Sequence, residues 1–189
     1  MSRLLLALVL SLALPSKADI GVESLRAGGY VLYLRHTSTD FSQNDSAMRG
    51  YDDCANQRNL TDKGRDEARA IGEHIRRLKI PIGAVLASPF CRTMETARLA
   101  FGKAQAMSEV RGGPARPDDP KRYEALKKLL STPVAKGENL VVSIHANPFY
   151  ALAGPPYLAE GEFAEIKPGG EAGFTVVGRI RLSDWPALR

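Results

Sequence analysis

Short hydrophobic runs alternate with amphipathic segments along most of this 189-residue chain. The runs at 30–34, 82–87 and 139–144 are rich in Val, Leu and Ile and are too short for helices, which is typical of buried strands. A weaker run at 104–109 predicts a further strand between the second and third of these. The spacing of the runs leaves room for a helix between successive strands.

The segments between the runs carry hydrophobic residues every three or four positions, which predicts helices. Thr61 is a typical N-cap for the first of them, and Pro81 ends that segment. The other predicted helices are 92–101, which Gly102 ends, a segment from Asp118 or Asp119 to about Leu130, and a short segment from about Pro148.

Two strand-like stretches at 162–167 and 173–180 flank Pro168-Gly169-Gly170, which predicts an antiparallel C-terminal hairpin. Strands that alternate with helices predict an α/β fold in three layers, with a mostly parallel sheet and helices on both faces. In such sheets, ligands bind beyond the carboxyl ends of the strands. The residues at those ends are therefore the first candidates for function.

The N-terminus has the pattern of a secretory signal peptide. Arg3 gives a positive start, residues 4–14 are apolar apart from Ser11, and small residues at 16 and 18 suit cleavage before Asp19. The apolar run is shorter than the ~20 residues that a membrane-spanning helix needs, although an uncleaved anchor is the alternative. We therefore expect a signal peptide at 1–18 and a single domain at 19–189.

Composition excludes several classes of protein. With 44% hydrophobic and 25% charged residues the chain is not of the disordered type, and a mean hydropathy of −0.20 does not suit a polytopic membrane protein. Two cysteines are too few for a disulfide-rich miniprotein or a cysteine-ligated zinc site. The net charge of +5 falls to +3 without residues 1–18, because these contain two basic residues and no acidic one.

Basic side chains follow three of the predicted strands. Arg35 and His36 come at the end of the first, Arg92 lies shortly after the second, and His145 directly follows the strand at 139–144. Parallel strands bring these ends together, so two arginines and two histidines converge on one crevice. Arginine binds phosphate oxygens in pairs, and a neutral histidine can attack phosphorus. The pattern predicts an anion site with a candidate nucleophile.

At these residues the chain resembles the histidine phosphatase superfamily, the phosphoglycerate-mutase-like proteins. One Arg-His pair would be weak evidence, but four motifs occur in the family's order between about 30 and 147, and the signal pattern suggests a small exported branch. The motifs are Leu34-Arg35-His36-Thr37, Asn59-Leu60-Thr61-Asp62-Lys63-Gly64 with Glu67-Ala68, Ser88-Pro89-Phe90-Cys91-Arg92 with Thr96-Ala97, and Val141-Val142-Ser143-Ile144-His145.

The resemblance implies a mechanism in which His36 attacks the phosphoryl group and forms a phosphohistidine that water then hydrolyses. Arg35, Arg92 and His145 would bind the equatorial oxygens and stabilise the charge of the transition state. His36 must then be neutral at its attacking nitrogen. The resemblance implies no metal ion and no cofactor.

The resemblance also makes Thr37, Asn59 and Asn147 candidates for substrate binding.

The proton donor of the leaving group remains open at this point. Of the family's two usual positions for this acid, one lies a few residues beyond Glu109, and the other, directly after the second histidine, holds Ala146. The further candidates are Asp118, Asp119, Glu160 and Glu162. We favour Glu162 and Glu109.

The two cysteines fit an oxidising compartment, and we hypothesise a disulfide between Cys54 and Cys91. On the chain-entropy model it would stabilise the fold by about 4 kcal/mol, and it would tether a loop beside the anion site. The alternative is two separate small apolar residues.

These observations together predict a periplasmic or secreted phosphatase that hydrolyses a phosphate monoester of a small molecule. Some exported relatives in the family are similar to lipopolysaccharide-core heptose phosphatases, so an envelope phosphosugar is one candidate substrate. The alternatives are a non-catalytic module that binds phosphorylated ligands and a structural envelope protein, while a mutase is less well supported. We expect no nucleic-acid partner and no stable membrane insertion, and the oligomeric state stays open.

Overall fold

The structure of the protein is a computed structural model that describes residues 17–111 and 121–189. The predicted signal peptide up to residue 16 lies outside the described residues, as do Asp118 and Asp119. Among the described residues, no helix is both long enough and apolar enough to cross a membrane.

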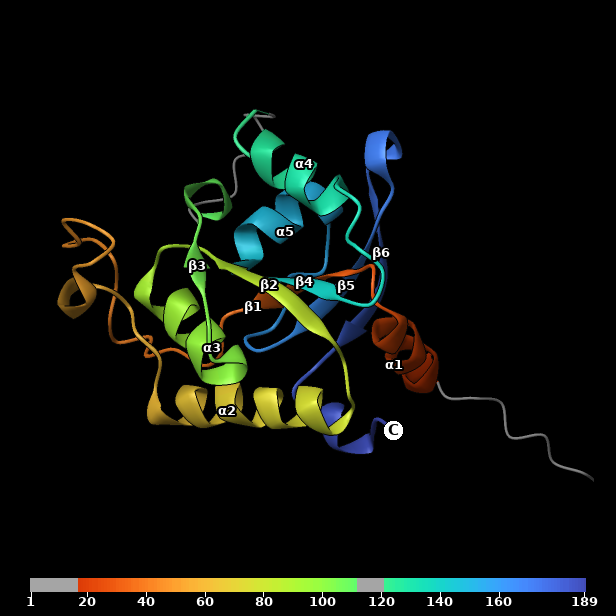
Figure 1. Cartoon of the computed structure of the whole chain (residues 1–189). Coiled ribbons are helices and arrows are strands. Elements are labelled where there is room, and N and C mark those ends of the chain that lie inside the picture. Colours follow the sequence, from red (N-terminus) through yellow and green to blue (C-terminus); the bar gives the residue numbers. More distant parts are fainter. Residues whose placement is uncertain (1–16, 112–120) are drawn as a thin grey trace, which may run out of the picture.

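A six-stranded sheet with the order β3-β2-β4-β1-β5-β6 forms the centre of the molecule (Figure 1). The first four strands in this order are parallel, whereas β5 runs antiparallel to β1 and forms an antiparallel hairpin with β6. The predicted α/β class, mostly parallel sheet and C-terminal hairpin are therefore confirmed. In chain order the strands are β1 (Val31–Arg35), β2 (Ile82–Ala87), β3 (Gln105–Ala106), β4 (Asn139–Ile144), β5 (Phe163–Pro168) and β6 (Phe174–Ile180).

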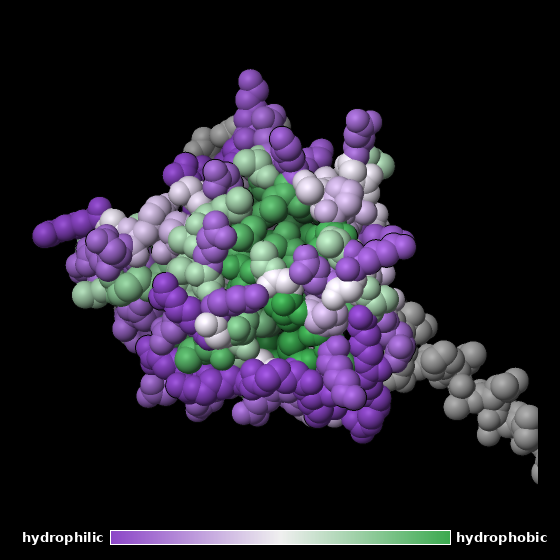
Figure 2. All heavy atoms as spheres, viewed as in Figure 1, coloured by the Kyte–Doolittle hydropathy of each residue, from purple (hydrophilic) through white to green (hydrophobic). Residues whose placement is uncertain are grey.

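Helices cover both faces of this sheet, as predicted. Side chains of α1, α2 and α3 pack with alternate residues of the strands in one core cluster, and those of α4 and α5 pack on the other face. Figure 2 shows polar residues around the rim of the molecule and hydrophobic residues at the centre of this view. The helices are α1 (Lys17–Ala27), α2 (Asp62–Arg77), α3 (Cys91–Phe101), α4 (Glu124–Ser131) and α5 (Ala146–Ala153).

Three elements differ from the sequence prediction. The strand expected at 104–109 is reduced to β3, whose two residues are exposed at the sheet edge, and a 3₁₀ turn at Ser108–Val110 follows it. The helix expected from about 118 begins at Glu124, because residues 121–123 form a turn. Helix α1 was not predicted, and it is held mainly by burial of Val22 and Leu25.

The start of α2 fixes the loop that leaves β1. The backbone N–H of Thr61 donates to the Ser38 carbonyl oxygen at 3.0 Å, and Glu67 Oε2 accepts from the Ser38 N–H at 3.0 Å. A Cβ at Gly64 would lie 2.0 Å from that carbonyl oxygen, so only glycine permits this approach. The stretch from Asn59 to Ala68, which we call the helix-start motif, therefore holds the backbone two residues after His36.

Candidate active site

A cavity of about 360 Å³ opens at the carboxyl ends of the parallel strands. The register brings these ends side by side, because Arg35 of β1 pairs with Ile144 of β4 and Ala87 of β2 pairs with Ser143. The four basic residues that were predicted to converge at the strand ends all line this cavity. The lining comprises Arg35, His36, Gln43, Asn44, Asp45, Arg58, Phe90, Arg92, His145, Ala146 and Asn147.

His36 follows β1 directly and is 1% exposed. Its backbone N–H donates to the Ile144 carbonyl oxygen at 3.0 Å, and the Gly161 N–H donates to the His36 carbonyl oxygen at 3.0 Å. The side-chain Nδ1 lies 3.0 Å from the Thr37 carbonyl oxygen. A carbonyl oxygen can only accept, so Nδ1 carries the proton and Nε2 keeps its lone pair. This tautomer is the one that a histidine nucleophile needs.

Thr37 is fully buried and does not line the cavity. Its backbone N–H donates to Thr96 Oγ1 at 3.3 Å, and Thr96 Oγ1 donates to the Arg92 carbonyl oxygen at 2.7 Å. These bonds connect the residue after His36 to the helix that carries Arg92. The structure thus places Thr37 where it orients the site, and not where the sequence had placed it, in contact with substrate.

His145 follows β4 and faces His36, with the two ring centroids 5.5 Å apart. Its Nε2 lies 2.9 Å from Ser88 Oγ, and its carbonyl oxygen accepts from the Tyr33 hydroxyl at 2.7 Å. The Phe90 ring packs edge-on against the imidazole, at 5.1 Å between centroids. Both ring and backbone of His145 are therefore fixed before any ligand enters.

Burial lowers the pKa of both histidines well below their ordinary value. For His36 the positive charges of Arg92, Arg35 and Arg58 lower the pKa further, although the bond to the Thr37 carbonyl acts against this. Both imidazoles are therefore neutral at neutral pH.

Two acceptors, a backbone carbonyl oxygen and a carboxylate, lie beside the guanidinium of Arg35. Its Nη1 donates to the Leu158 carbonyl oxygen at 2.6 Å, and its Nη2 lies 3.7 Å from Glu160 Oε1. The same Oε1 lies 3.8 Å from His36 Nδ1, and Glu160 Oε1 accepts from the Thr39 hydroxyl at 2.6 Å. Glu160 thus lies beside the protonated nitrogen of His36, and it does not line the cavity.

Arg92 comes from the first turn of α3 and is 5% exposed. Its Nη1 and Nη2 donate to the two carboxylate oxygens of Asp45, at 2.9 and 3.0 Å. Nη1 also donates to the Arg58 carbonyl oxygen at 3.1 Å. A bidentate carboxylate therefore occupies the guanidinium that is expected to bind phosphoryl oxygens.

Arg58 is a third arginine of the cavity that the sequence analysis missed. Its guanidinium carbon lies 4.9 Å from the ring centroid of Phe41. The buried Nε–H groups of Arg35, Arg58 and Arg92 all lack a hydrogen-bond acceptor among the described residues. A buried donor without an acceptor costs about 1–3 kcal/mol, and each of these three arginines carries that cost. The only sequence signal for Arg58 was its place directly before the helix-start motif.

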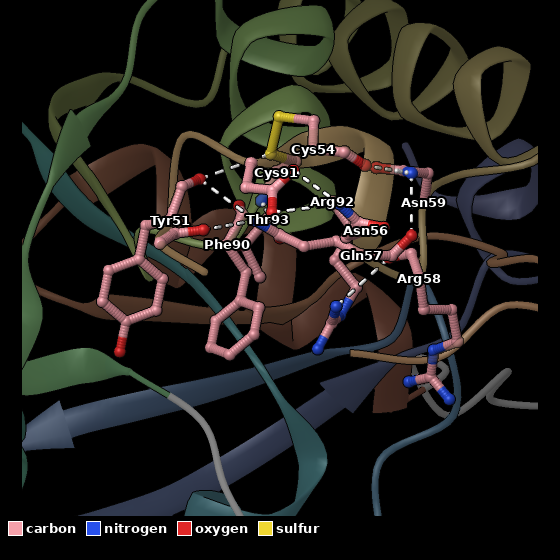
Figure 3. Close-up of a disulfide and its surroundings, with 12 residues drawn as sticks. Tyr51, Cys54, Asn56, Gln57, Arg58, Asn59, Phe90, Cys91, Arg92 and Thr93 are labelled. Atoms are coloured by element: carbon pink, nitrogen blue, oxygen red, sulfur yellow. Dashed lines mark hydrogen bonds between the residues drawn. A yellow bond between two sulfur atoms is a disulfide. The ribbon is translucent and has the colours of Figure 1, made fainter. Parts of the chain in front are cut away.

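The predicted disulfide between Cys54 and Cys91 is present, with the two Cα atoms 5.7 Å apart. It links the loop before α2 to the first residue of α3. Gln57 strengthens this link, because its Oε1 accepts from the Cys91 N–H at 2.9 Å and its Nε2 donates to the Tyr51 carbonyl oxygen at 3.1 Å. Figure 3 shows the side chains of Phe90, Arg92 and Arg58 extending to the same side, away from the disulfide.

The two predicted asparagines have different places. Asn147, in the first turn of α5, lines the cavity. Asn59 does not, because its Nδ2 donates to the carbonyl oxygens of Cys54 and Gln57, at 2.8 and 2.9 Å. Asn59 thus stabilises the disulfide-linked loop.

Neither favoured proton donor reaches the cavity. Glu162 is 2% exposed, and both of its oxygens accept from Arg179, at 2.8 and 2.9 Å. Its Oε2 also accepts from the Ala159 N–H at 2.7 Å, so the carboxylate is fully engaged in holding the chain before β5. Glu109 is exposed in the 3₁₀ turn after β3. The prediction that Glu162 and Glu109 lie at the reaction centre was therefore wrong, because it relied on their distance along the chain from the motifs.

Among residues 17–111 and 121–189, no group of three His, Cys, Asp or Glu side chains lies close enough to hold a metal ion. The cavity instead offers three guanidinium groups, two neutral imidazoles and one free histidine lone pair. This set can bind a tetrahedral oxyanion and attack its central atom.

The family model of the histidine phosphatase superfamily (branch 1) matches residues 31–112, which include three of the four motifs that carried the predicted resemblance. A search of curated protein sequences found no significant match to the chain.

Solved structures share the fold at low sequence identity. The protein histidine phosphatase SixA complexed with tungstate is 22% identical, with a TM-score of 0.55 over 82% of this chain and 98% of its own. A mycobacterial glucosyl-3-phosphoglycerate phosphatase complexed with VO3 is 16% identical, with a TM-score of 0.54 over 74% and 92%. YhfR from Bacillus stearothermophilus is 19% identical, with a TM-score of 0.52 over 78% and 94%.

Proposed function

Residues 31–112 belong to the histidine phosphatase superfamily, and from this premise we propose that the protein is a phosphatase that hydrolyses phosphate monoesters through a phosphohistidine on His36. The observation that carries the proposal is the tautomer of His36. Its Nδ1–H is committed to the Thr37 carbonyl oxygen, so the lone pair of Nε2 belongs to a neutral ring that lines a cavity with three arginines.

The first step forms a bond between His36 Nε2 and phosphorus while the bond to the leaving oxygen breaks. Arg35, Arg92 and His145 stabilise the negative charge on the equatorial oxygens, and their positions are fixed beforehand by their own hydrogen bonds. Such preorganised donors are worth about 10²–10³-fold each in rate. In the second step water attacks phosphorus and His36 leaves as a neutral imidazole.

The proposed substrate is a small phosphorylated molecule, of which an envelope phosphosugar is one case. A cavity of about 360 Å³ accommodates a phosphoryl group and a small attached moiety. One structural neighbour is named as a phosphatase of glucosyl-3-phosphoglycerate, which is a small phosphorylated molecule of this kind. A panel of phosphorylated sugars, lipids and peptides would identify the class by the ratio of kcat/KM values.

We further propose that the chain is exported. The signal pattern at residues 1–18 and a disulfide between its two cysteines both suit an oxidising compartment. Mass spectrometry of protein recovered from the periplasm or medium should find Asp19 as the first residue. Recovery of the intact chain from the cytosol would contradict export.

The test of the proposed function is turnover of 4-nitrophenyl phosphate at about pH 4–8. The wild-type protein should release nitrophenol, and His36→Ala should fall to background while keeping its circular dichroism spectrum and its stabilisation by phosphate. Activity of His36→Ala close to wild type would mean that the nucleophile is another residue. Phosphate binding without turnover by the wild type would indicate a binding protein, and no binding would indicate a structural one.

A further inference from the structure

Asp45 is the acidic residue in the lining of the cavity, among the residues that the structure describes. It lies in the loop between β1 and α2, and its side chain is 33% exposed. The other nearby carboxylate, Glu160, lies 3.8 Å from His36 Nδ1. A leaving group departs on the side of phosphorus opposite His36 Nε2, so Glu160 is on the wrong side to reach it.

The position of Asp45 is fixed by its partners on both sides. Besides the bidentate pair with Arg92, its Oδ1 accepts from the Arg58 N–H at 2.9 Å, and its carbonyl oxygen accepts from the Met48 N–H at 3.2 Å. The disulfide anchors the same loop. The backbone can therefore stay beside the cavity when the side chain turns.

An incoming phosphoryl group and the Asp45 carboxylate compete for the same fork of Arg92. Guanidinium binds phosphate and carboxylate oxygens with the same paired geometry, so the dianion can take the place of Asp45. Burial raises the pKa of Asp45, but hydrogen bonds from Arg92 and the Arg58 backbone outweigh this effect and hold the pKa below its ordinary value. Displacement from Arg92 removes the main stabilising partner of the charged form, and the adjacent dianion favours the protonated form.

We propose that Asp45, displaced from Arg92 by the substrate, is the general acid that protonates the leaving group. This inference rests on the proposed function. In the first step His36 Nε2 bonds to phosphorus, the bond from phosphorus to the leaving oxygen breaks, and the proton of Asp45 moves to that oxygen. In the second step water attacks phosphorus, its proton returns to the Asp45 carboxylate, and the bond from phosphorus to His36 breaks. Asp45 is thus protonated again at the end of the cycle.

The test compares two substrates whose leaving groups differ in their need for a proton. Nitrophenolate leaves without protonation, whereas an alkoxide such as that of glycerol phosphate does not. Asp45→Asn should lower kcat/KM for glycerol phosphate by about 10²–10³-fold and for 4-nitrophenyl phosphate by less than about tenfold. Asp52→Asn is the matched control, because Asp52 is exposed in the same loop and lies outside the cavity lining, and it should change neither value.

Equal losses on both substrates would overturn the proposal, because they would mean that Asp45 only positions Arg92. Unchanged activity on both would overturn it as well. Asp45→Ser provides the same comparison if the asparagine variant fails to fold, as judged by thermal unfolding. The proposed function is judged separately, by wild-type turnover of 4-nitrophenyl phosphate and its loss in His36→Ala.

Discussion

The two halves of the cavity are built in different ways. One half consists of Arg35, His36 and His145, which lie at strand ends. Backbone carbonyl oxygens fix Arg35 and His36, and the side chains of Tyr33 and Ser88 fix His145. The other half, which we call the loop wall, consists of residues 43–45 and Arg58, and it is held by the disulfide and Gln57. The strand ends thus supply fixed chemistry, while the loop wall can adjust its charge when a ligand enters.

The largest expected difference between the halves is in the effect of losing an arginine. Arg35→Ala should lower kcat/KM for 4-nitrophenyl phosphate by about 10³-fold, because Arg35 is a preorganised donor to the phosphoryl oxygens. Arg58→Ala should lower it by about tenfold, mostly through KM, because Arg58 belongs to the loop wall. Steady-state kinetics on the two variants would measure this. Similar losses in both variants would remove the distinction between the halves.

The next effect concerns the disulfide. Replacing both cysteines (Cys54→Ser with Cys91→Ser) should lower the free energy of unfolding by about 2–4 kcal/mol. The loss should disturb the position of the loop wall more than that of the strand ends. KM should therefore rise, while kcat falls less than about tenfold. Urea unfolding and steady-state kinetics would test both points. A large loss of kcat with an unchanged KM would show that the disulfide supports the strand ends instead.

A smaller effect is expected in the pH dependence of stability. The folded protein keeps His36 and His145 neutral because burial lowers the pKa of each well below the ordinary value of 6.5. Below about pH 6.5 the unfolded chain binds protons that the folded one does not, so these groups destabilise the fold as pH falls.

Each such histidine lowers the free energy of unfolding by up to about 1.4 kcal/mol for each pH unit below about pH 6.5. His36→Ala should therefore reduce the loss of unfolding free energy between about pH 6.5 and 5, relative to wild type. Chemical denaturation at a series of pH values would show it. An unchanged slope would mean that His36 is protonated in the folded state, which does not suit a nucleophile.

The smallest effect is expected outside both halves. Glu109 is exposed and does not line the cavity, so Glu109→Gln should change kcat/KM by less than about twofold. A large loss would restore Glu109 as a candidate acid.

The same two halves explain what the sequence could predict. Hydrophobic runs predicted strands β2 and β4. Short motifs predicted the four basic residues at the strand ends, which are Arg35, His36, Arg92 and His145. These are local features, and the parallel register then brings them together.

The loop wall could not be predicted in this way. Asp45 and Arg58 reach the cavity through loop geometry that depends on a disulfide across a separation of 37 residues and on Gln57. No periodic pattern in the sequence encodes that path. Glu162 and Glu109 were favoured as proton donors because of their distance along the chain from the motifs. That distance does not show that Arg179 binds both carboxylate oxygens of Glu162.

The central claim, a phosphohistidine on His36, is tested most directly by trapping the intermediate. The wild-type protein would be mixed with ³²P-labelled substrate, quenched in alkaline denaturant within milliseconds and digested for peptide mapping. The account predicts acid-labile, alkali-stable label on the peptide that contains His36, and none in His36→Ala. Label on another residue, or full turnover with no labelled peptide, would contradict it.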